Sequence, residues 1–469
     1  MTTDLCALSA TELLHLYRAR QVSPVEVTKA VLARIDKLNP VLNAFCLVDA
    51  KAALDAAKFS EARWAKGEPK GLLDGVPTSI KDLLLTKGWP TLRGSKTINA
   101  KGPWKDDAPS VARLREHGAV LIGKTTTPEF GWKGVTDNPL TGITRNPWDP
   151  RVTPGGSSGG GAAAVAAGMG ALTVGTDGGG SIRIPCAFTG LFGLKPSFGR
   201  VPAWPASPFG TVAHVGPMTR TVSDAALMLN VLSLPDVRDW LALPHEARDY
   251  RVGLADGVSG LRVAYSATLG YAKVEREVAA LVKAAALRFA ELGAHVEEVD
   301  PGFENAEPIF RAHWFSGAAY LLKNFSAEQK AKMDPGLVEV AAQGAKLGML
   351  ELVEAAQKRA ALGLHMNAFH ENYDLLLTPT LPLAAFEAGK EVADMLKERR
   401  WTDWSPFSYP FNLTQQPAAS IPCGLTKAGL PVGLHIVGPR YADALVLRAA
   451  RAYETLAPIR LPELSKLAK

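Results

Sequence analysis

The chain has 469 residues, of which 47 % are hydrophobic, and this predicts a soluble globular protein with a sizeable buried core. Its 52 basic and 46 acidic residues nearly balance at a net charge of +6, and the longest charged run is the short KERR segment at 397–400, so we expect no nucleic-acid partner. No apolar run approaches the roughly 18 residues that a membrane span needs, and the N-terminal residues lack a signal-peptide pattern. We therefore expect a cytoplasmic protein that does not contact a membrane.

The cysteines and histidines do not indicate a metal site. The four cysteines lie far apart and include no CxxC pair, which predicts free thiols in a reducing compartment: Cys6, Cys46, Cys186 and Cys423. No HExxH motif is present, and His365 and His370 are five positions apart, which does not match the spacing of two ligands on one helical face. We expect neither a metal nor a cofactor.

The first third of the chain opens with helices. In SPVEVTKAVLARI, Ser23 is a capping residue, Pro24 stands at the first helical position and Glu26 at the capping-box position, so a helix is predicted from here. Farther on, APSVARLREHGAVLIGK, which begins at Ala108, predicts a helix that ends at Gly118 and is followed by an apolar strand.

The same order of helix, glycine and strand returns in VEREVAALVKAAALRFAELGAHVEEV, which begins at Val274. Further strands are predicted at 261–266, 374–380, 418–425 and 433–438, followed by a closing helix at 442–456. This alternation predicts an α/β fold with a central mixed, largely parallel β-sheet covered by helices on both faces. The stretch 303–369 is predicted to be mostly helical, and its aromatic residues fit either core, the commoner outcome, or a lid over a pocket.

No Pro/Gly/Ser linker cuts the chain, so we predict a single domain over residues 1–469. Within it we distinguish an N-terminal helical segment over about 1–65, a core over about 70–235 and a C-terminal helical and sheet-completing part over about 255–469.

Two glycine- and serine-rich stretches flank a small-residue segment in TPGGSSGGGAAAVAAGMGALTVGTDGGGSIRIP, at 153–185. Nucleotide binding is disfavoured because the first stretch lacks the GK[ST] ending of a P-loop. Acyl transfer remains, which needs a nucleophile, a base and backbone donors for an oxyanion. The glycines Gly178, Gly179 and Gly180 can turn their N–H groups inward as such donors, next to the hydroxyl of Ser181 as a candidate nucleophile.

A lysine is the most economical candidate for the base, because no His/Asp pair is evident. Lysine can act as a base only when burial or neighbouring positive charge makes it neutral, since its ordinary pKa is about 10.4. Lys81 ends the strand-like segment GVPTSIK and is followed by the apolar run Leu83–Leu85, which favours burial. The alternative is a surface lysine at the end of a strand.

Three motifs occur in order along the chain: GGSSGG at 155–160, GTDGGGSIRIP at 175–185 and GLFGLKPSFGRVP at 190–202. Together they resemble the amidase signature family, which are hydrolases with a Ser–cis-Ser–Lys triad. The likeness extends upstream through GVPTSIKD and downstream through NLTQQPAASIPCGLTKAGLPVGLHIVG, so it covers most of the chain.

The resemblance implies that Ser181 is the acyl-forming nucleophile, Ser157 the bridging serine that follows a cis peptide bond, and Lys81 the base. It also implies oxyanion donors on the backbone from Gly178 through Ser181. Supporting roles fall on three further residues: Ser158, Asp177 and Arg183. For Arg183, a simple ion pair at the sheet edge is an equally good interpretation.

The resemblance further implies an amide hydrolase that cleaves a carbon–nitrogen bond, in an amide or a carbamate, through a serine acyl-enzyme. The alternative within the family is the glutamine-hydrolysing component of a tRNA-dependent amidotransferase. This alternative is disfavoured because Ile184 stands where those proteins tend to have Gln, and because SPFSYPFN at 405–412 lacks their glutamine-recognising Asp. A catalytically silent binding protein is disfavoured because every triad position is filled.

The expected partner is a small-molecule substrate that is hydrophobic or aryl, and a homodimer is one assembly that the sequence leaves open. The residues expected to bind substrate are Trp132, Thr136, Phe411 and Asn412, and further aromatic candidates for the pocket are Trp314, Phe315 and Tyr320.

Overall fold

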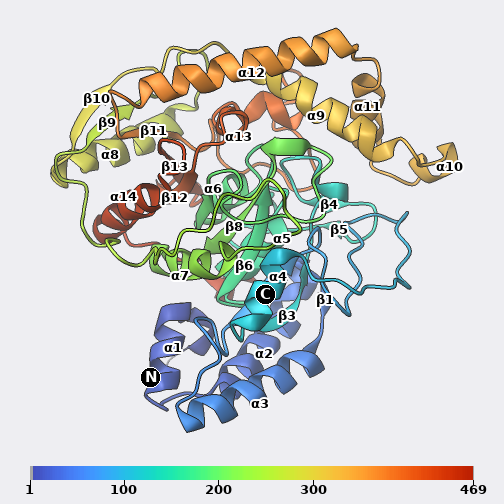
Figure 1. Cartoon of the computed structure of the whole chain (residues 1–469), viewed down its shortest axis with the longest axis vertical. Helices are drawn as coiled ribbons and strands as arrows, with labels where there is room; N and C mark the ends of the chain where they lie inside the picture. The colour runs from blue at the N-terminus through green and yellow to red at the C-terminus, as the bar shows by residue number, and fades with distance from the viewer. Residues whose placement is uncertain (1–3, 468–469) are drawn as a thin grey trace.

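The computed structural model describes residues 4–467, and within them eleven strands form one sheet (Figure 1). The strands are β1 (Phe45–Val48), β2 (Pro77–Lys81), β3 (Val120–Thr125), β6 (Leu172–Asp177), β7 (Phe192–Lys195), β8 (His214–Thr219), β9 (Arg262–Tyr265), β10 (His295–Glu298), β11 (Leu375–Pro379), β12 (Ala418–Leu425) and β13 (Pro431–Val437). Their order is β1-β3-β2-β6-β8-β7-β12-β13-β11-β9-β10, and β4 (Asp137–Asn138) and β5 (Gly142–Ile143) form a separate hairpin.

The sheet is mixed, as predicted, and its parallel pairings fall into two groups. The strands β3, β2 and β6 pair in parallel, and so do β11, β9 and β10. The pairings from β6 through β8, β7, β12 and β13 to β11, and that of β1 with β3, are antiparallel. The parallel share is therefore smaller than the alternation of helices and strands predicts. The reason is visible at β12 and β13, where a short turn around 426–430 replaces the crossover helix that a parallel connection requires.

The described residues contain fourteen α-helices, and the ones predicted from capping and periodicity are present. The helix predicted from Ser23 is α2, and the Ser23 and Glu26 side chains form its capping box. The helices are α1 (Ala10–Arg18), α2 (Pro24–Leu42), α3 (Ala50–Lys66), α4 (Pro109–Glu116), α5 (Gly159–Ala166), α6 (Arg183–Thr189), α7 (Val222–Leu232), α8 (Arg276–Glu291), α9 (Glu307–Leu322), α10 (Ala327–Lys330), α11 (Pro335–Gly344), α12 (Met349–Phe369), α13 (Pro410–Leu413) and α14 (Asp443–Leu456).

Helices cover both faces of the sheet, which is shown at β6. A Cβ built on Gly161 of α5 would lie 2.8 Å from Thr173 Oγ1, so Thr173 faces α5. Leu172 and Val174 alternate with Thr173 along β6, so their side chains point to the opposite face of the sheet. Both are fully buried, so that face is covered as well.

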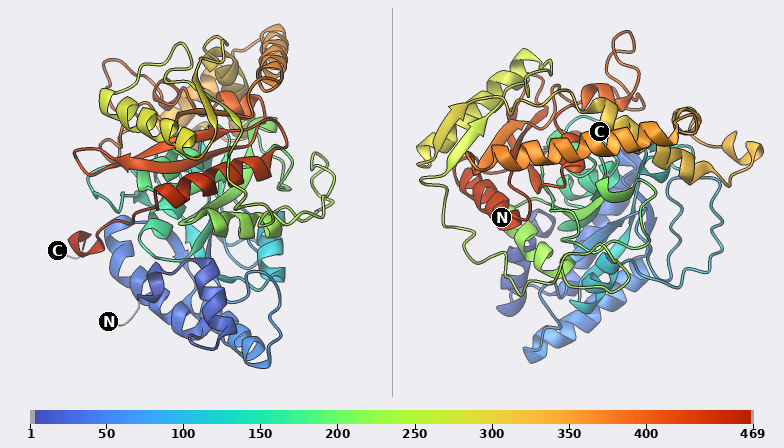
Figure 2. Two further views of the ribbon diagram at one scale, coloured as in Figure 1. Left: turned by 90° about the vertical axis from the view of Figure 1, so that its left-hand side faces the viewer. Right: turned by 45° about the horizontal axis from the view of Figure 1, so that its top comes forward.

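The helices α9, α11 and α12 gather at one end of the molecule and the N-terminal helices α1–α3 at the other (Figures 1 and 2). The side chains of α9 and α12 show how the aromatic residues of the stretch 303–369, expected to form either core or a lid, are placed. Phe310 and Trp314 of α9 are buried, as predicted for core, and Trp314 also lines a cavity, whereas Tyr320 is 60 % exposed. The outer side of α12 also carries exposed apolar residues, among them Met349 and Leu364.

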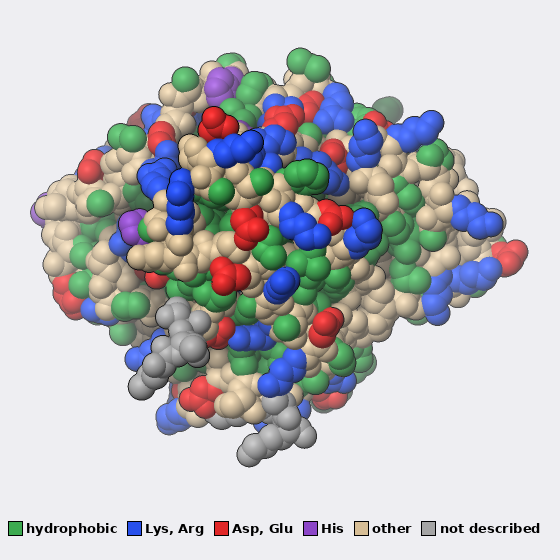
Figure 3. All heavy atoms as spheres, turned by 90° about the horizontal axis from the view of Figure 1, so that it is seen from below, with side chains coloured by type: hydrophobic (Ala, Val, Ile, Leu, Met, Phe, Trp, Pro, Cys, Tyr) green, Lys and Arg blue, Asp and Glu red, His purple; other side chains and the backbone are tan. Residues whose placement is uncertain are grey.

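Basic and acidic side chains are interspersed over the face that is seen from below in Figure 3, with hydrophobic side chains between them, so neither sign of charge dominates this face. Among the helices of residues 4–467, none combines the length and the apolar character that crossing a membrane requires.

Candidate active site

Lys81 is the last residue of β2, and the structure buries it completely. Its Nζ lies 2.7 Å from Ser157 Oγ, 2.8 Å from Ser158 Oγ and 2.9 Å from Thr176 Oγ1. Burial lowers the pKa of Lys81 well below its ordinary value, and the negative charge of Asp177 opposes only part of this shift. Lys81 is therefore a buried amine that favours the neutral form and is surrounded by hydroxyl groups.

The hydroxyl group of Ser158 orients this amine. Ser158 Oγ donates a hydrogen bond to the carbonyl oxygen of Thr176 at 3.2 Å, so its single proton is engaged there. Its oxygen can then only accept from Lys81. A neutral amine has two N–H donors and one lone pair, and three hydroxyl neighbours match these three positions.

The loop that carries Ser157 lies close against the backbone of a neighbouring segment. The Gly156–Ser157 peptide bond is cis, as the resemblance implies. A Cβ on Gly156 would lie 2.5 Å from the carbonyl carbon and oxygen of Val135, so only glycine fits at this position. The N–H of Ser158 donates to the carbonyl oxygen of Ser181 at 3.2 Å, which ties this loop to the second glycine-rich loop.

Ser181 stands at the end of the second glycine-rich loop and lines a cavity that Ser157, Thr176 and Gly178 also line. Within residues 4–467 the Ser181 hydroxyl group has no hydrogen-bond partner. A hydroxyl group that opens into a cavity and is not engaged by the protein is available to attack a bound carbonyl group.

Asp177 fixes the shape of this loop and changes the expected set of oxyanion donors. Its Oδ1 accepts the N–H of Gly180 at 2.8 Å, so that group is engaged inside the protein and does not point at a substrate. The N–H groups of Gly178, Gly179 and Ser181 donate to no acceptor in the described part of the chain. The prediction for Gly180 thus needs correction, while the predictions for Gly178 and Gly179 stay open.

The Asp177 carboxylate is held by a buried pair with Arg183. Nε and Nη2 of Arg183 donate to the two carboxylate oxygens at 2.9 Å each, and Asn412 Nδ2 donates to Oδ1 at 2.8 Å. Burial alone would raise the pKa of Asp177, but the charge and hydrogen bonds of Arg183 hold it well below its usual range. The pair is a charged and fully buried support for the loop that carries Ser181, which fits the supporting interpretation of both residues.

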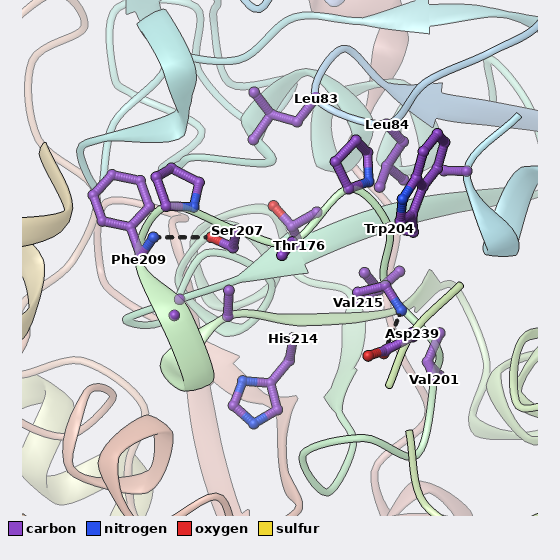
Figure 4. Close-up of a pocket in the computed structure, with 18 of the residues that line it drawn as sticks. Leu83, Leu84, Thr176, Val201, Trp204, Ser207, Phe209, His214, Val215 and Asp239 are labelled. Atoms are coloured by element: carbon purple, nitrogen blue, oxygen red, sulfur yellow. Dashed lines mark hydrogen bonds between the residues drawn. The ribbon is translucent and has the colours of Figure 1, made fainter. Parts of the chain in front are cut away.

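The cavity above these residues has a volume of about 390 Å³ and mostly apolar walls (Figure 4). They come mainly from the segments that follow β2, β3 and β7, from β8 and from α9. The main apolar residues are Leu83, Leu84, Phe130, Val201, Trp204, Phe209, Val215, Trp314 and Leu321. Phe209 stacks on Trp314 with ring centroids 3.8 Å apart, and this pair forms a flat aromatic surface within the wall.

The four residues predicted to bind substrate do not line this cavity. Trp132 and Phe411 are fully buried in an apolar cluster that also contains Phe310 and Trp401. The hydroxyl group of Thr136 donates to the carbonyl oxygen of Gly155, and Asn412 is engaged with Asp177. Their side chains are used to build the site rather than to line it. Of the further aromatic candidates, Trp314 lines the cavity, whereas Phe315 is buried and Tyr320 lies on the surface.

Several residues that line the cavity were not predicted. The segment 196–209 carries Phe209 and Trp204, and it continues the third motif, GLFGLKPSFGRVP. Thr176, which contacts Lys81, directly precedes Asp177 in the second motif. The sequence could have pointed to these residues, because Thr176 lies in the second motif and Trp204 and Phe209 follow the third.

The protonation state of Lys81 makes stability depend on pH in one direction. Lysine in an unfolded chain has a pKa of about 10.4, whereas burial lowers the pKa of Lys81 in the folded protein. Between these values the unfolded chain binds one more proton, so the free energy of unfolding rises with pH. We expect urea unfolding to show that wild type gains stability relative to Lys81→Met from neutral pH up to about pH 10. A difference that does not change with pH would contradict a neutral amine.

Comparisons with known proteins agree with this geometry. The family model "Amidase" matches residues 26–447. The chain is 39 % identical over 460 residues to an acylamidase of Rhodococcus erythropolis, with 96 % of each chain covered. It is 37 % identical to a glutamyl-tRNA(Gln) amidotransferase subunit of Myxococcus xanthus, over 96 % of this chain and 97 % of the relative.

Among solved structures, a bacterial aryl acylamidase of the amidase signature enzymes superposes with a TM-score of 0.90 at 34 % identity, covering 98 % of this chain and 97 % of that one. The 6-aminohexanoate cyclic dimer hydrolase, solved with its substrate, gives a TM-score of 0.89 at 28 % identity, covering 98 % and 100 %. The family model covers most of the chain, and the relatives match over nearly the whole of it. The chain belongs to the amidase family, and it is an amide hydrolase that acts on carbon–nitrogen bonds other than peptide bonds.

Proposed function

We propose that the protein hydrolyses hydrophobic aryl amides, and aryl carbamates by the same chemistry, with Ser181 as the nucleophile and Lys81 and Ser157 as the proton relay. One observation carries this proposal: a fully buried amine that favours the neutral form contacts the hydroxyl group of Ser157, which lines the same cavity as Ser181. Such an amine can accept a proton near neutral pH, which an ordinary surface lysine cannot.

In the first half of the reaction, Ser181 Oγ forms a bond to the substrate carbonyl carbon. Its proton passes to Ser157 while the proton of Ser157 passes to Lys81 Nζ. The negative charge that develops on the carbonyl oxygen is stabilised by the free N–H groups of Gly178, Gly179 and Ser181. The carbon–nitrogen bond then breaks, and the leaving amine takes the proton back from Lys81 through Ser157.

In the second half, a water molecule attacks the acyl group on Ser181. Its proton passes through Ser157 to Lys81 Nζ, the bond between the acyl carbon and Ser181 Oγ breaks, and a proton returns from Lys81 through Ser157 to Ser181 Oγ as the carboxylic acid is released. For an N-aryl carbamate, cleavage of the carbon–nitrogen bond releases the arylamine and leaves an alkoxycarbonyl group on Ser181. Water then releases this group as a carbonic acid monoester, which breaks down to carbon dioxide and the alcohol. The proton relay uses only Ser181, Ser157, Lys81 and the attacking water molecule.

The walls of the cavity support an aryl substrate. The stacked pair of Phe209 and Trp314 offers a flat surface on which a ring can lie. Among the described residues that line the cavity, Asp239 is the one carboxylate, and its oxygens accept the backbone N–H groups of Ala203 and Leu241. It is therefore engaged, which disfavours glutamine, whose ammonium group would need a free carboxylate.

The proposal is tested with purified protein and four substrates: 4-nitroacetanilide, benzamide, an aryl carbamate and glutamine. We expect hydrolysis of the anilide and the carbamate, little hydrolysis of glutamine, and loss of all activity in Ser181→Ala. Ser60→Ala, which removes a buried hydroxyl group of α3 outside the cavity, is the matched control and should keep wild-type turnover. Activity on glutamine alone, or turnover that survives in Ser181→Ala, would refute the proposal.

A further inference from the structure

The cavity contains a guanidinium group without a partner. Arg93 lines the cavity, and within residues 4–467 its side chain donates no hydrogen bond, lies over no aromatic ring and has no carboxylate oxygen within 4.0 Å. The other arginine of the cavity wall, Arg238, is fully engaged. It pairs with Asp236 at 2.7 Å and lies over the ring of Trp204.

The backbone of Arg93 is fixed between segments that carry the catalytic groups. Its φ of 56° is in the left-handed region, which a non-glycine residue adopts only when its surroundings hold it there. Its N–H donates to Asp82 Oδ2 at 2.8 Å, and its carbonyl oxygen accepts the N–H of Phe130 at 2.8 Å. Asp82 follows Lys81 directly along the chain.

Phe130, the other backbone hydrogen-bond partner of Arg93, also lies near the proposed proton relay. It lines the cavity, and a Cβ on the next residue, Gly131, would lie 3.4 Å from Ser157 Oγ. Both backbone hydrogen bonds of Arg93 therefore join it to segments that lie next to Lys81 and Ser157. These two hydrogen bonds set the direction in which the Arg93 side chain leaves the backbone.

The nearest carboxylate does not neutralise Arg93, because other groups use it. Asp82 accepts the Arg93 N–H and pairs with the buried amine of Lys124, its Oδ1 lying 3.3 Å from Lys124 Nζ. Burial lowers the pKa of Arg93, and the negative charge of Asp82 offsets only part of that effect. The guanidinium group is thus partly withdrawn from water and lacks the paired anion that such groups normally have.

We propose that Arg93 is a specificity-determining residue that binds a carboxylate on the substrate, so that the preferred substrates are apolar or aryl amides carrying a carboxylate group. This proposal rests on the proposed function, because it concerns the same cavity and the same reaction. The planar guanidinium group can donate two parallel hydrogen bonds to a carboxylate. The apolar wall and the arginine together select a molecule with an apolar body and one negative charge.

The test compares substrates that differ only in this charge. One pair places it on the amine side, 4-acetamidobenzoate against 4-methylacetanilide, and a second places it on the acyl side, succinanilic acid against butyranilide. We expect the carboxylate member of at least one pair to have the higher kcat/KM with wild type. In Arg93→Gln that preference should fall at least tenfold, through KM, while the neutral members change less than threefold. Arg93→Lys should keep part of the preference.

Arg238→Gln is the matched control, because it removes a positive charge from the same cavity wall, but one that is already paired with Asp236. It should leave the preference for carboxylate substrates unchanged. Should Arg93→Gln not fold, wild type gives a second measurement, in which 4-aminobenzoate inhibits at least tenfold more strongly than 4-methylaniline. Two results would overturn the proposal. In the first, wild type prefers neither carboxylate substrate and is inhibited equally by 4-aminobenzoate and 4-methylaniline. In the second, Arg93→Gln lowers kcat/KM equally for the charged and the neutral member of each pair. Failure of the proposed function is distinct, because wild type would then hydrolyse neither neutral anilide.

Discussion

Replacing Lys81 with methionine should lower kcat on an aryl amide by about 10⁴- to 10⁶-fold, the range seen when one member of a serine hydrolase triad is removed. Methionine fills a similar volume in the buried position but cannot accept a proton. The hydroxyl groups of Ser157 and Ser158 then lose the amine that both now contact. The acylation step loses its base, so the loss appears in kcat and equally in kcat/KM. Stopped assays with a sensitive anilide measure it.

A second buried lysine provides the contrast. Lys124 lies on β3 beside β2, and its Nζ donates to the carbonyl oxygen of Leu84 and to Thr91 Oγ1 and pairs with Asp82. Lys124→Met leaves the Asp82 carboxylate buried and unpaired, so we expect it to lower stability while activity per folded molecule stays within about tenfold of wild type. If both lysine variants lost activity to the same extent, the loss in Lys81→Met would be explained by packing and not by proton transfer.

Introducing a side chain at Gly178 should lower kcat by about 10²-fold, because it disturbs one donor of the oxyanion site. In this protein a Cβ on Gly178 would lie 2.8 Å from Trp314 Cζ3, and that indole is held in place by a hydrogen bond to the carbonyl oxygen of Trp132 at 3.0 Å and by the stacked ring of Phe209. Gly178→Thr must therefore shift the loop or the indole.

The double variant Gly178→Thr with Trp314→Leu separates the two effects. It removes the indole that the new side chain meets, so we expect at least a tenfold recovery of kcat over Gly178→Thr alone. Gly363→Ala is the control, since a Cβ at this position of α12 meets nothing within 4 Å, and it should not change kcat. A single variant as active as wild type would show that the position of this N–H group does not matter to the reaction.

The residues proposed to be catalytic could be named from the sequence, Lys81 and Ser181 from their local sequence and Ser157 from the family resemblance. Lys81 ends a short apolar strand, and the successive glycines before Ser181 allow a backbone that turns its donors inward. The engagement of Gly180 by Asp177 could not be predicted in the same way, because it depends on which direction the carboxylate takes after β6.

The cavity wall could not be predicted because it is built from segments far apart in the chain. Leu83, Phe209 and Trp314 meet only once the strands and α9 are in place. Trp132 and Phe411 were expected there because they are large and aromatic, but such residues fill cores as readily as they line pockets. The free guanidinium group of Arg93 has no signature in sequence, since a paired arginine looks the same there.

The most direct test of the central claim is to locate the acyl group on the enzyme. An aryl carbamate that deacylates slowly is added, the protein is denatured during turnover, and the tryptic peptide 152–183, which contains Ser157 and Ser181, is fragmented by tandem mass spectrometry. The account predicts a modified Ser181 with Ser157 unmodified, and no modification in Lys81→Met. A modified Ser157, or turnover during which neither serine is modified, would contradict it.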